Sequence, residues 1–96
     1  MKKLGTVGNY KILASRHSLQ RSRQRSVDML QVVGAILTFG AQKLDEYSDN
    51  QADVMLIDEN NNFSVVFAVK KAKIEIITVI DKADCFVKNG TAIAKL

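Results

Sequence analysis

Residues 52–81 read ADVMLIDENNNFSVVFAVKKAKIEIITVID, a stretch in which apolar residues recur with the period of a β-strand. Its three runs rich in valine, isoleucine and phenylalanine are Ala52–Asp58, Phe63–Lys70 and Lys73–Asp81. The polar segments between these runs, Glu59–Asn62 and Lys70–Ala72, are short enough to be turns. Because a short turn reverses the chain, the stretch predicts an antiparallel β-meander.

The alternation also predicts which side chains share a face of this meander. In the last two strands, one face is predicted to hold Phe63, Val65, Phe67, Val69, Ile74, Ile76, Thr78 and Ile80. The opposite face holds Val66, Ile77 and Val79 and is therefore partly apolar as well. We expect much of both sides of the sheet to be covered.

After the meander, the dipeptide Asn89-Gly90 lies between two short strand-like runs. The first is Cys85–Lys88 and the second is Thr91–Ala94. Asn-Gly favours the tight turn that joins two antiparallel strands. This pattern predicts a C-terminal hairpin, which we expect to cover an edge of the sheet.

Before the meander, the residue spacing is helical. Tyr10–Ala14 is expected to be a short extended segment, and Ser15 is a suitable N-cap for a first helix over Arg16–Arg25. That helix is expected to pack through a narrow stripe made of Ser15, Leu19, Ser22 and Ser26. Ser26 is expected to cap a second helix, Val27–Phe39, with Asp28 in its first turn and Gly40 after its end. The predicted core face of the second helix is Val27, Leu30, Val33, Ile36 and Leu37.

These elements predict a single α+β domain over residues 1–96, with two N-terminal helices packed on an antiparallel β-meander and a C-terminal hairpin. The composition, 47% hydrophobic and 25% charged, is typical of a folded globular protein. The longest apolar stretch, around Val32–Phe39, is too short to span a bilayer. The chain has one cysteine, Cys85, so an internal disulfide is excluded and a reducing compartment is favoured. We expect a cytoplasmic protein with no membrane association.

The positive charge is concentrated at the N-terminal end. Residues 1–27 contain seven lysines and arginines and no acidic residue, whereas residues 28–96 contain seven basic and ten acidic residues. Such an asymmetry predicts an anionic partner for the first third of the chain, either a nucleic acid or an acidic protein.

One group of residues in this third has a regular spacing. His17, Arg21 and Arg25 are four residues apart, so on a helix they form one row. We call these three residues the cationic row. Guanidinium groups bind phosphate oxygens in pairs, and histidine is the side chain that transfers protons near neutral pH. One histidine and one distant cysteine do not make a zinc site of the usual kind, and no phosphate-binding glycine loop is present. We therefore expect phosphate recognition without a metal or a cofactor.

The same residues resemble the opening of a small bacterial family. His17-x3-Arg21-x3-Arg25, preceded by Ser15-Arg16 and followed by Ser26-Val27-x-Met29-Leu30, is similar to the family's "K/R-H-A-x-x-R-x-x-x-R-G-I" helix. Ile76–Ile80, which reads IITVI, corresponds to the family's last "V-V-I-T-V" strand. Ser26 stands where the family usually has glycine. This family of uncharacterised domains is placed near the RelE and BrnT ribonuclease toxins, with the barnase/colicin/RelE-like fold, and the resemblance covers roughly residues 12–81.

The resemblance implies a toxin-type, metal-independent endoribonuclease, in which the ribose 2′-hydroxyl attacks the neighbouring phosphorus. It implies His17 as the general acid or base, and Arg21 and Arg25 as stabilisers of the phosphate charge that develops. Further contacts to RNA would come from Arg16, Arg23, Lys70, Lys71 and Lys73. An acidic antitoxin is the protein partner that the resemblance implies. The alternative is a non-enzymatic basic module, such as a phage-type inhibitor, that uses the same row to bind a nucleic acid or an acidic protein.

Overall fold

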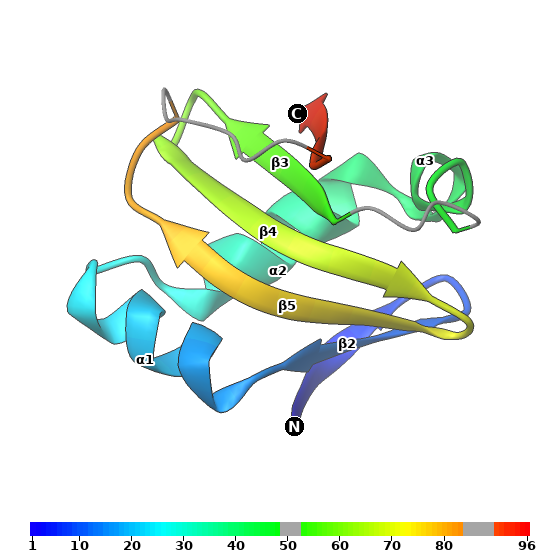
Figure 1. Ribbon diagram of the computed structural model, residues 1–96, viewed down its shortest axis with the longest axis horizontal. Helices are drawn as coiled ribbons and strands as arrows, with labels where there is room; N and C mark the ends of the chain where they lie inside the picture. Colours follow the sequence, from blue (N-terminus) through cyan, green and yellow to red (C-terminus); the bar gives the residue numbers. More distant parts are fainter. Residues whose placement is uncertain (49–52, 84–89) are drawn as a thin grey trace.

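The computed structural model describes residues 1–48, 53–83 and 90–96, and within them the fold is α+β, with helices and a mixed β-sheet (Figure 1). The strands are β1 (Lys2–Val7), β2 (Tyr10–Ala14), β3 (Val54–Asp58), β4 (Phe63–Lys70), β5 (Lys73–Ile80) and β6 (Ala92–Lys95). The helices are α1 (Arg16–Gln24), α2 (Met29–Phe39) and α3 (Ala41–Asp45). None of the described helices is long and apolar enough to cross a membrane.

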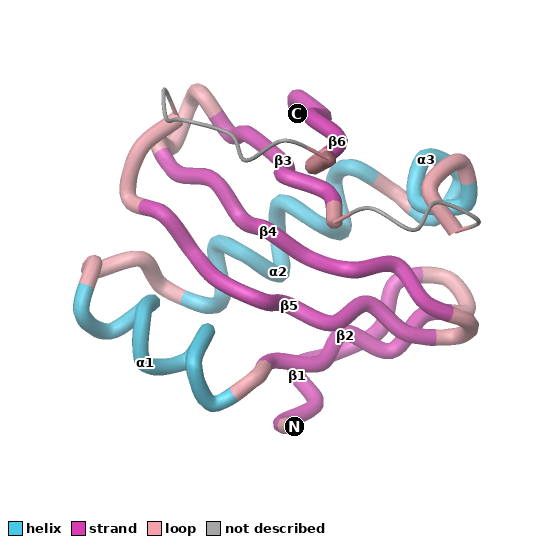
Figure 2. The backbone as a smooth tube through the Cα atoms, in the orientation of Figure 1, coloured by secondary structure: helices cyan, strands magenta, loops and turns pink. Residues whose placement is uncertain are grey.

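The predicted meander forms the centre of the sheet. Strands β3, β4 and β5 pair antiparallel in that order, which confirms the prediction. The complete order is β1-β2-β5-β4-β3-β6, and the outer strands are added in two ways (Figure 2). β1 and β2 form an antiparallel hairpin, and β2 runs parallel to β5. At the other edge, β6 runs parallel to β3.

Helix α2 lies across one face of this sheet, behind it in Figure 1, and the main core fills the space between them. The largest fully buried side chains come from both layers and include Ile36 of α2 with Leu56, Phe63, Phe67, Ile74 and Ile76 of the sheet. Burial of such side chains contributes about 1.5–3 kcal/mol each. The core thus anchors β5, the strand beside which α1 lies.

The sheet is larger than the sequence predicted, because β1 was not foreseen and β2 was expected only as a short extended segment. The first strand contains Lys2, Lys3 and Gly5, which do not form an alternating apolar pattern. It is an edge strand with both lysines exposed, and it pairs with β2 through a register shift between Lys3 and Gly5. Edge strands commonly carry charge in this way, so their apolar signal is weak.

The second helix begins two residues later than predicted, at Met29. Its N-cap is Asp28, whose carboxylate accepts a hydrogen bond from the Leu30 backbone N–H at 2.9 Å. Ser26 does not cap this helix, because its backbone has a φ of +54°, in the left-handed region rather than the extended region of an N-cap. The end of the helix at Gly40 is as predicted.

The predicted core face is correct for Ile36 and for Val27 just before α2, which are buried, and for Val33, which packs partly buried against the core, but it is wrong for Leu30 and Leu37. Leu30 is 78% exposed and Leu37 is 49% exposed, whereas the buried residues of the helix are Val32, Ala35, Ile36 and Phe39. The helix MLQVVGAILTF contains no charged residue, so more than one face has apolar residues at helical spacing. Periodicity alone therefore does not identify the face that packs on the sheet.

A bulge in β5 changes the predicted alternation of that strand. Val66 pairs with Thr78 while the next residue, Phe67, pairs with Ile76, so Ile77 is an extra residue. Beyond Ile77 the faces exchange: Val79 is fully buried, and Thr78 and Ile80 are only half-buried. The prediction that Thr78 and Ile80 share a face with Ile74 and Ile76 is therefore wrong.

The C-terminal prediction is met in part. Ala92–Lys95 is a strand and covers the β3 edge of the sheet, in parallel pairing with Val54–Ile57. Its predicted hairpin partner, Cys85–Lys88, and the turn residue Asn89 lie outside the described residues. In the described part of the chain, the α+β class and the central meander are confirmed, and the meander is part of a six-stranded mixed sheet.

Candidate functional site

Helix α1 lies along the edge of β5 that β2 leaves free. β2 pairs only with Lys73–Ile76, and α1 follows the rest of the strand (Figure 1). Three hydrogen bonds fasten the helix to that edge, and one of them is donated by the Ser15 hydroxyl to the Ile77 carbonyl at 3.5 Å. The Ser15 backbone N–H donates to the Ile76 carbonyl at 3.4 Å, and the Arg25 guanidinium donates to the Val79 carbonyl at 2.7 Å. The helix thus replaces a neighbouring strand and satisfies a carbonyl that would otherwise face solvent.

The sequence of α1 explains its position. Ser15 is its N-cap, as predicted, and its hydroxyl oxygen accepts a hydrogen bond from the Ser18 N–H at 3.0 Å. The buried residues of the helix are Ser18 and Ser22, which are small enough to let the helix approach the sheet closely. Of the predicted packing stripe, Ser22 is buried, Ser15 and Leu19 are half-buried, and Ser26 is exposed, so the prediction is wrong only for Ser26.

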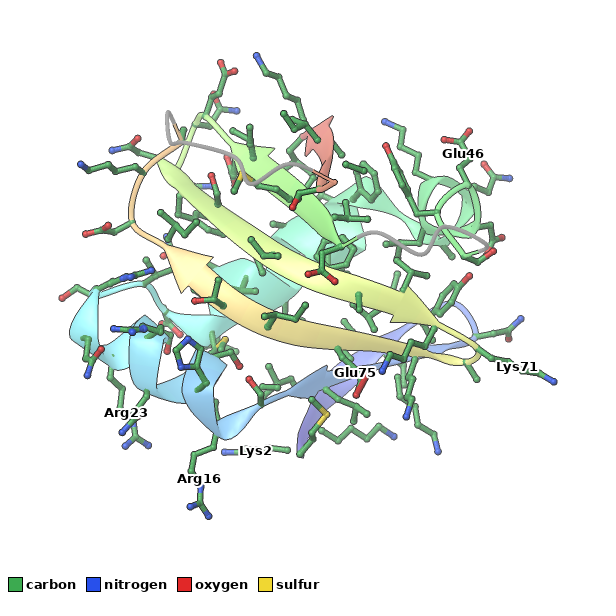
Figure 3. All side chains as sticks on the ribbon, viewed as in Figure 1. Lys2, Arg16, Arg23, Glu46, Lys71 and Glu75 are labelled. Carbon is green, nitrogen blue, oxygen red and sulfur yellow. The ribbon has the colours of Figure 1, made fainter. Side chains whose placement is uncertain are left out.

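The rest of α1 faces away from the sheet. Its exposed residues are Arg16, His17, Gln20, Arg23 and Gln24, and Arg21 is half-buried. In Figure 3, Arg16 and Arg23 extend outward from the molecule at the edge where Lys2 also lies. No acidic residue is present in the helix. This surface is therefore cationic without internal neutralisation.

The cationic row lies in one shallow depression between α1 and the end of β5. The depression has a volume of about 570 Å³ and is lined by His17, Arg21, Arg25, Ile77, Thr78, Ile80, Asp81 and Lys82. The Arg21 Nε donates to the His17 Nε2 at 3.5 Å, and another Arg21 nitrogen donates to the Gln24 amide oxygen at 3.0 Å. The structure thus brings together the three residues that the sequence grouped.

Within the row, the three side chains have different partners. Arg25 is half-buried and holds the strand carbonyl of Val79, so one side of its guanidinium is committed to the fold. The hydrogen bonds of His17 and Arg21 given above are all made within α1, so neither side chain is bonded to the sheet. They are the members of the row that are best placed to contact a ligand.

The predicted lysines are not part of this site. Lys70, Lys71 and Lys73 surround the turn at the start of β5, whereas the cationic row lies at its end. The β5 residues that line the depression, Ile77, Thr78 and Ile80, are four to seven positions beyond Lys73, on the order of 13–23 Å along an extended strand. Lys70 is paired with Glu75, and this ammonium group lowers the pKa of the Glu75 carboxyl below its ordinary value of 4.5.

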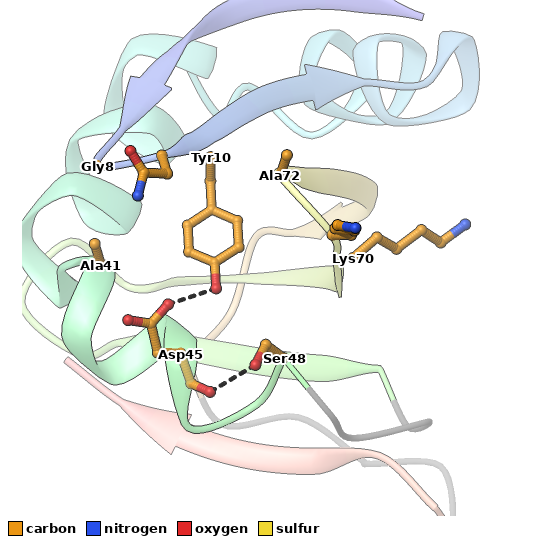
Figure 4. A pocket seen from close by; sticks show the side chains of 9 residues that line it. Gly8, Tyr10, Ala41, Asp45, Ser48, Lys70 and Ala72 are labelled. Atoms are coloured by element: carbon orange, nitrogen blue, oxygen red, sulfur yellow. Dashed lines mark hydrogen bonds between the residues drawn. The ribbon is translucent and has the colours of Figure 1, made fainter.

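Lys70 and Lys71 border a second depression, of about 510 Å³, at the opposite end of the sheet (Figure 4). Here the Tyr10 hydroxyl donates to the Asp45 carboxylate at 2.6 Å, which joins β2 to α3. Gly8 has a φ of +56°, and a Cβ at this position would lie 2.6 Å from that of Ala41. Glycine is therefore required at this turn, and the arrangement explains how the hairpin packs on α3.

Sequence reasoning missed Asp81 and Lys82, which line the same depression as the cationic row. They directly follow the last meander strand, but only the position of α1 beside that strand brings them to the row. Among the described residues, no group of three or more histidine, cysteine, aspartate or glutamate side chains is arranged to hold a metal ion.

No protein-family model, no curated protein and no solved structure matches this chain.

Proposed function

We propose that this chain is a nucleic-acid-binding module that contacts phosphates through α1. The observation that carries the proposal is the acid-free exposed surface of that helix, on which Arg16, Arg21 and Arg23 have no carboxylate partner among the described residues. Arg21 and Arg25 are four residues apart, a spacing at which like charges on a helix repel one another, and bound phosphate would offset that repulsion.

The location of the helix also supports this function. α1 is at the periphery of the molecule, fastened by its small serine face and by Arg25, while its opposite face is open to solvent (Figure 3). A polyanion can reach the exposed side chains without any rearrangement of the core. Guanidinium groups on a fixed helix lose less conformational freedom on binding than those on a flexible tail.

The proposal is tested by fluorescence anisotropy with labelled DNA and RNA oligonucleotides at low salt. The variant Arg16→Gln/Arg21→Gln/Arg23→Gln should bind at least about tenfold more weakly than the wild type, since each lost phosphate contact removes counterion release. The matched control, Lys70→Gln/Lys71→Gln/Lys73→Gln, removes the same charge at the other end of β5 and should bind within about threefold of the wild type. Equal losses in both variants would show that only net charge matters and would contradict a site on α1.

A second candidate is the metal-independent endoribonuclease that the RelE/BrnT resemblance implies, and the contact between His17 and Arg21 supports it. In this reaction the 2′-oxygen attacks phosphorus while its proton passes to a base, and the 5′-oxygen leaves with a proton from an acid. His17 would move one of these protons, and Arg21 would stabilise the charge on phosphate.

This second candidate is tested by incubating RNA with the protein in EDTA and analysing the ends of the products. Cleavage leaving 2′,3′-cyclic phosphate is expected, and His17→Ala should lower its rate by about 10²–10⁴-fold without changing the melting temperature by more than a few degrees. RNA that stays intact would leave the binding function without this chemistry. Equal cleavage by His17→Ala would show that the protein is a ribonuclease but that His17 does not move the proton.

A further inference from the structure

We infer that the outward ridge of α1, formed by Arg16, Gln20, Arg23 and Gln24, reads base edges in the major groove of duplex DNA. This inference rests on the proposed nucleic-acid binding and specifies its ligand class.

The first argument is shape. At 100° per residue, Gln20 lies almost opposite the midpoint between the buried Ser18 and Ser22, so the ridge is the part of α1 farthest from the sheet. A helix of this kind is a convex surface about 10–12 Å in diameter, and the major groove of B-form DNA is about 12 Å wide. The A-form major groove of duplex RNA is too narrow for it.

The second argument is side-chain chemistry. Arginine contacts guanine and glutamine contacts adenine through paired hydrogen bonds at the major-groove edge. Both residue types alternate along the ridge, and all four of its members are exposed. Neither glutamine adds charge to the ridge, and the Gln24 amide oxygen already accepts a hydrogen bond from Arg21 at 3.0 Å, so Gln20 is the ridge glutamine best placed to contact a base edge.

The third argument is the charge beside the ridge. His17 and Arg21, two members of the cationic row, lie on one side of the ridge, where the backbone of one DNA strand would pass. Near the start of α1, the register of β1 pairs Lys2 with Ala14, two residues before Arg16, and places another cation there. Cations beside a base-reading helix hold it in register on the phosphates.

The length of the helix limits the site. Nine residues of α-helix span about 14 Å, which corresponds to about four base pairs. The structure therefore assigns a short recognition sequence to each copy of the chain.

The test is selection of bound sequences from a pool of 20-bp DNA duplexes with a randomised centre, followed by titration of the selected duplex. Wild-type protein should enrich a motif of about four base pairs and prefer that duplex to the same sequence as duplex RNA or as a single strand. Gln20→Ala should weaken binding of the selected duplex by about 5- to 100-fold and should change binding of an unrelated duplex less than about twofold. Gln31→Ala, which alters an exposed glutamine on α2, is the matched control and should have no effect.

Three results would overturn the inference. Enrichment of no motif would show that the ridge contacts phosphate only. Binding of duplex RNA or single strands as tightly as the selected duplex would show that α1 does not enter the major groove, and the proposed nucleic-acid binding would still stand. Binding of no nucleic acid at all would remove that proposed function together with the inference.

Discussion

Arg25 links the candidate site to the fold through a single hydrogen bond. The sequence placed it in the cationic row by its spacing from His17 and Arg21, and the depression contains all three side chains. Its bond to the Val79 carbonyl was not predictable, because it joins residues 54 positions apart. Local spacing therefore predicted which side chains lie together but not which of them the fold already uses.

From this bond we predict that Arg25→Ala destabilises the protein by about 1–2 kcal/mol, because it leaves the strand carbonyl without its charged donor. The measurement is urea unfolding followed by circular dichroism. Arg23→Ala removes the same charge from an exposed position of α1 and should change the unfolding free energy by less than about 0.5 kcal/mol. Equal effects of the two substitutions would contradict a structural role for Arg25.

A second residue-level prediction concerns pH. The Lys70 ammonium lowers the pKa of Glu75, so the charged carboxylate is favoured in the folded state. The resulting stabilisation is fully present above the ordinary pKa of 4.5 and is lost as the pH falls through the lower pKa of the folded protein.

Glu75→Gln should therefore lower the melting temperature at pH 7 and have progressively less effect below about pH 4.5. Because Lys70 is 55% exposed, the effect at pH 7 should stay within about 1 kcal/mol. The exposed Glu59–Lys95 pair provides the control substitution, Glu59→Gln, which should be nearly neutral. A Glu75→Gln effect that does not change with pH would disprove this linkage.

At the scale of the helices and strands, prediction succeeded where the signal is local. The Ser15 cap, the three meander strands and the helix end at Gly40 all depend on residues adjacent in the sequence. It failed where contact with a neighbouring layer decides which residues are buried. In α2, for example, Leu30 was predicted to lie in the core but is exposed. The bulge at Ile77 belongs to the same class, since strand pairing rather than alternation determines it.

The turn between α1 and α2 provides a prediction at this scale. Ser26 has a φ of +54°, a conformation that costs a non-glycine residue about 1 kcal/mol, and it stands where the resembling family has glycine. Ser26→Gly should therefore raise the unfolding free energy by about 0.5–1 kcal/mol, as measured by thermal or urea unfolding. Gln20→Gly, in the middle of α1, should have the opposite sign, with a loss of about 1 kcal/mol. A destabilised Ser26→Gly protein would show that the serine hydroxyl makes a contact that matters more than the backbone strain.

At the scale of the whole molecule, the sequence predicted the fold class but not the complete sheet. Antiparallel neighbours such as β3, β4 and β5 are joined by short turns and can be inferred from them. The parallel pairs, β2 with β5 and β3 with β6, join strands separated by whole helices or by other strands, and no local pattern signals them. The pairing of β2 with only half of β5 leaves the edge on which α1 lies.

The charge asymmetry was readable from the sequence, and the structure shows which of these charges share a surface. Of the seven basic residues in the first 27, four lie on α1 or at its C-terminal end, and the lysines at the β4–β5 turn lie at the other end of β5. A site confined to α1 should contact a small number of phosphates, about three to five.

The central claim, that α1 binds the phosphates of nucleic acid, is tested most directly by the salt dependence of duplex DNA binding. For three to five contacts, log affinity should fall with log salt concentration with a slope of about −3 to −4.5. The variant Arg16→Gln/Arg21→Gln/Arg23→Gln should make the slope shallower, between about −2 and 0. The variant Lys70→Gln/Lys71→Gln/Lys73→Gln should leave the slope unchanged. A slope near zero for the wild-type protein, or a slope that the lysine substitutions lower as much as the arginine substitutions do, would contradict the claim.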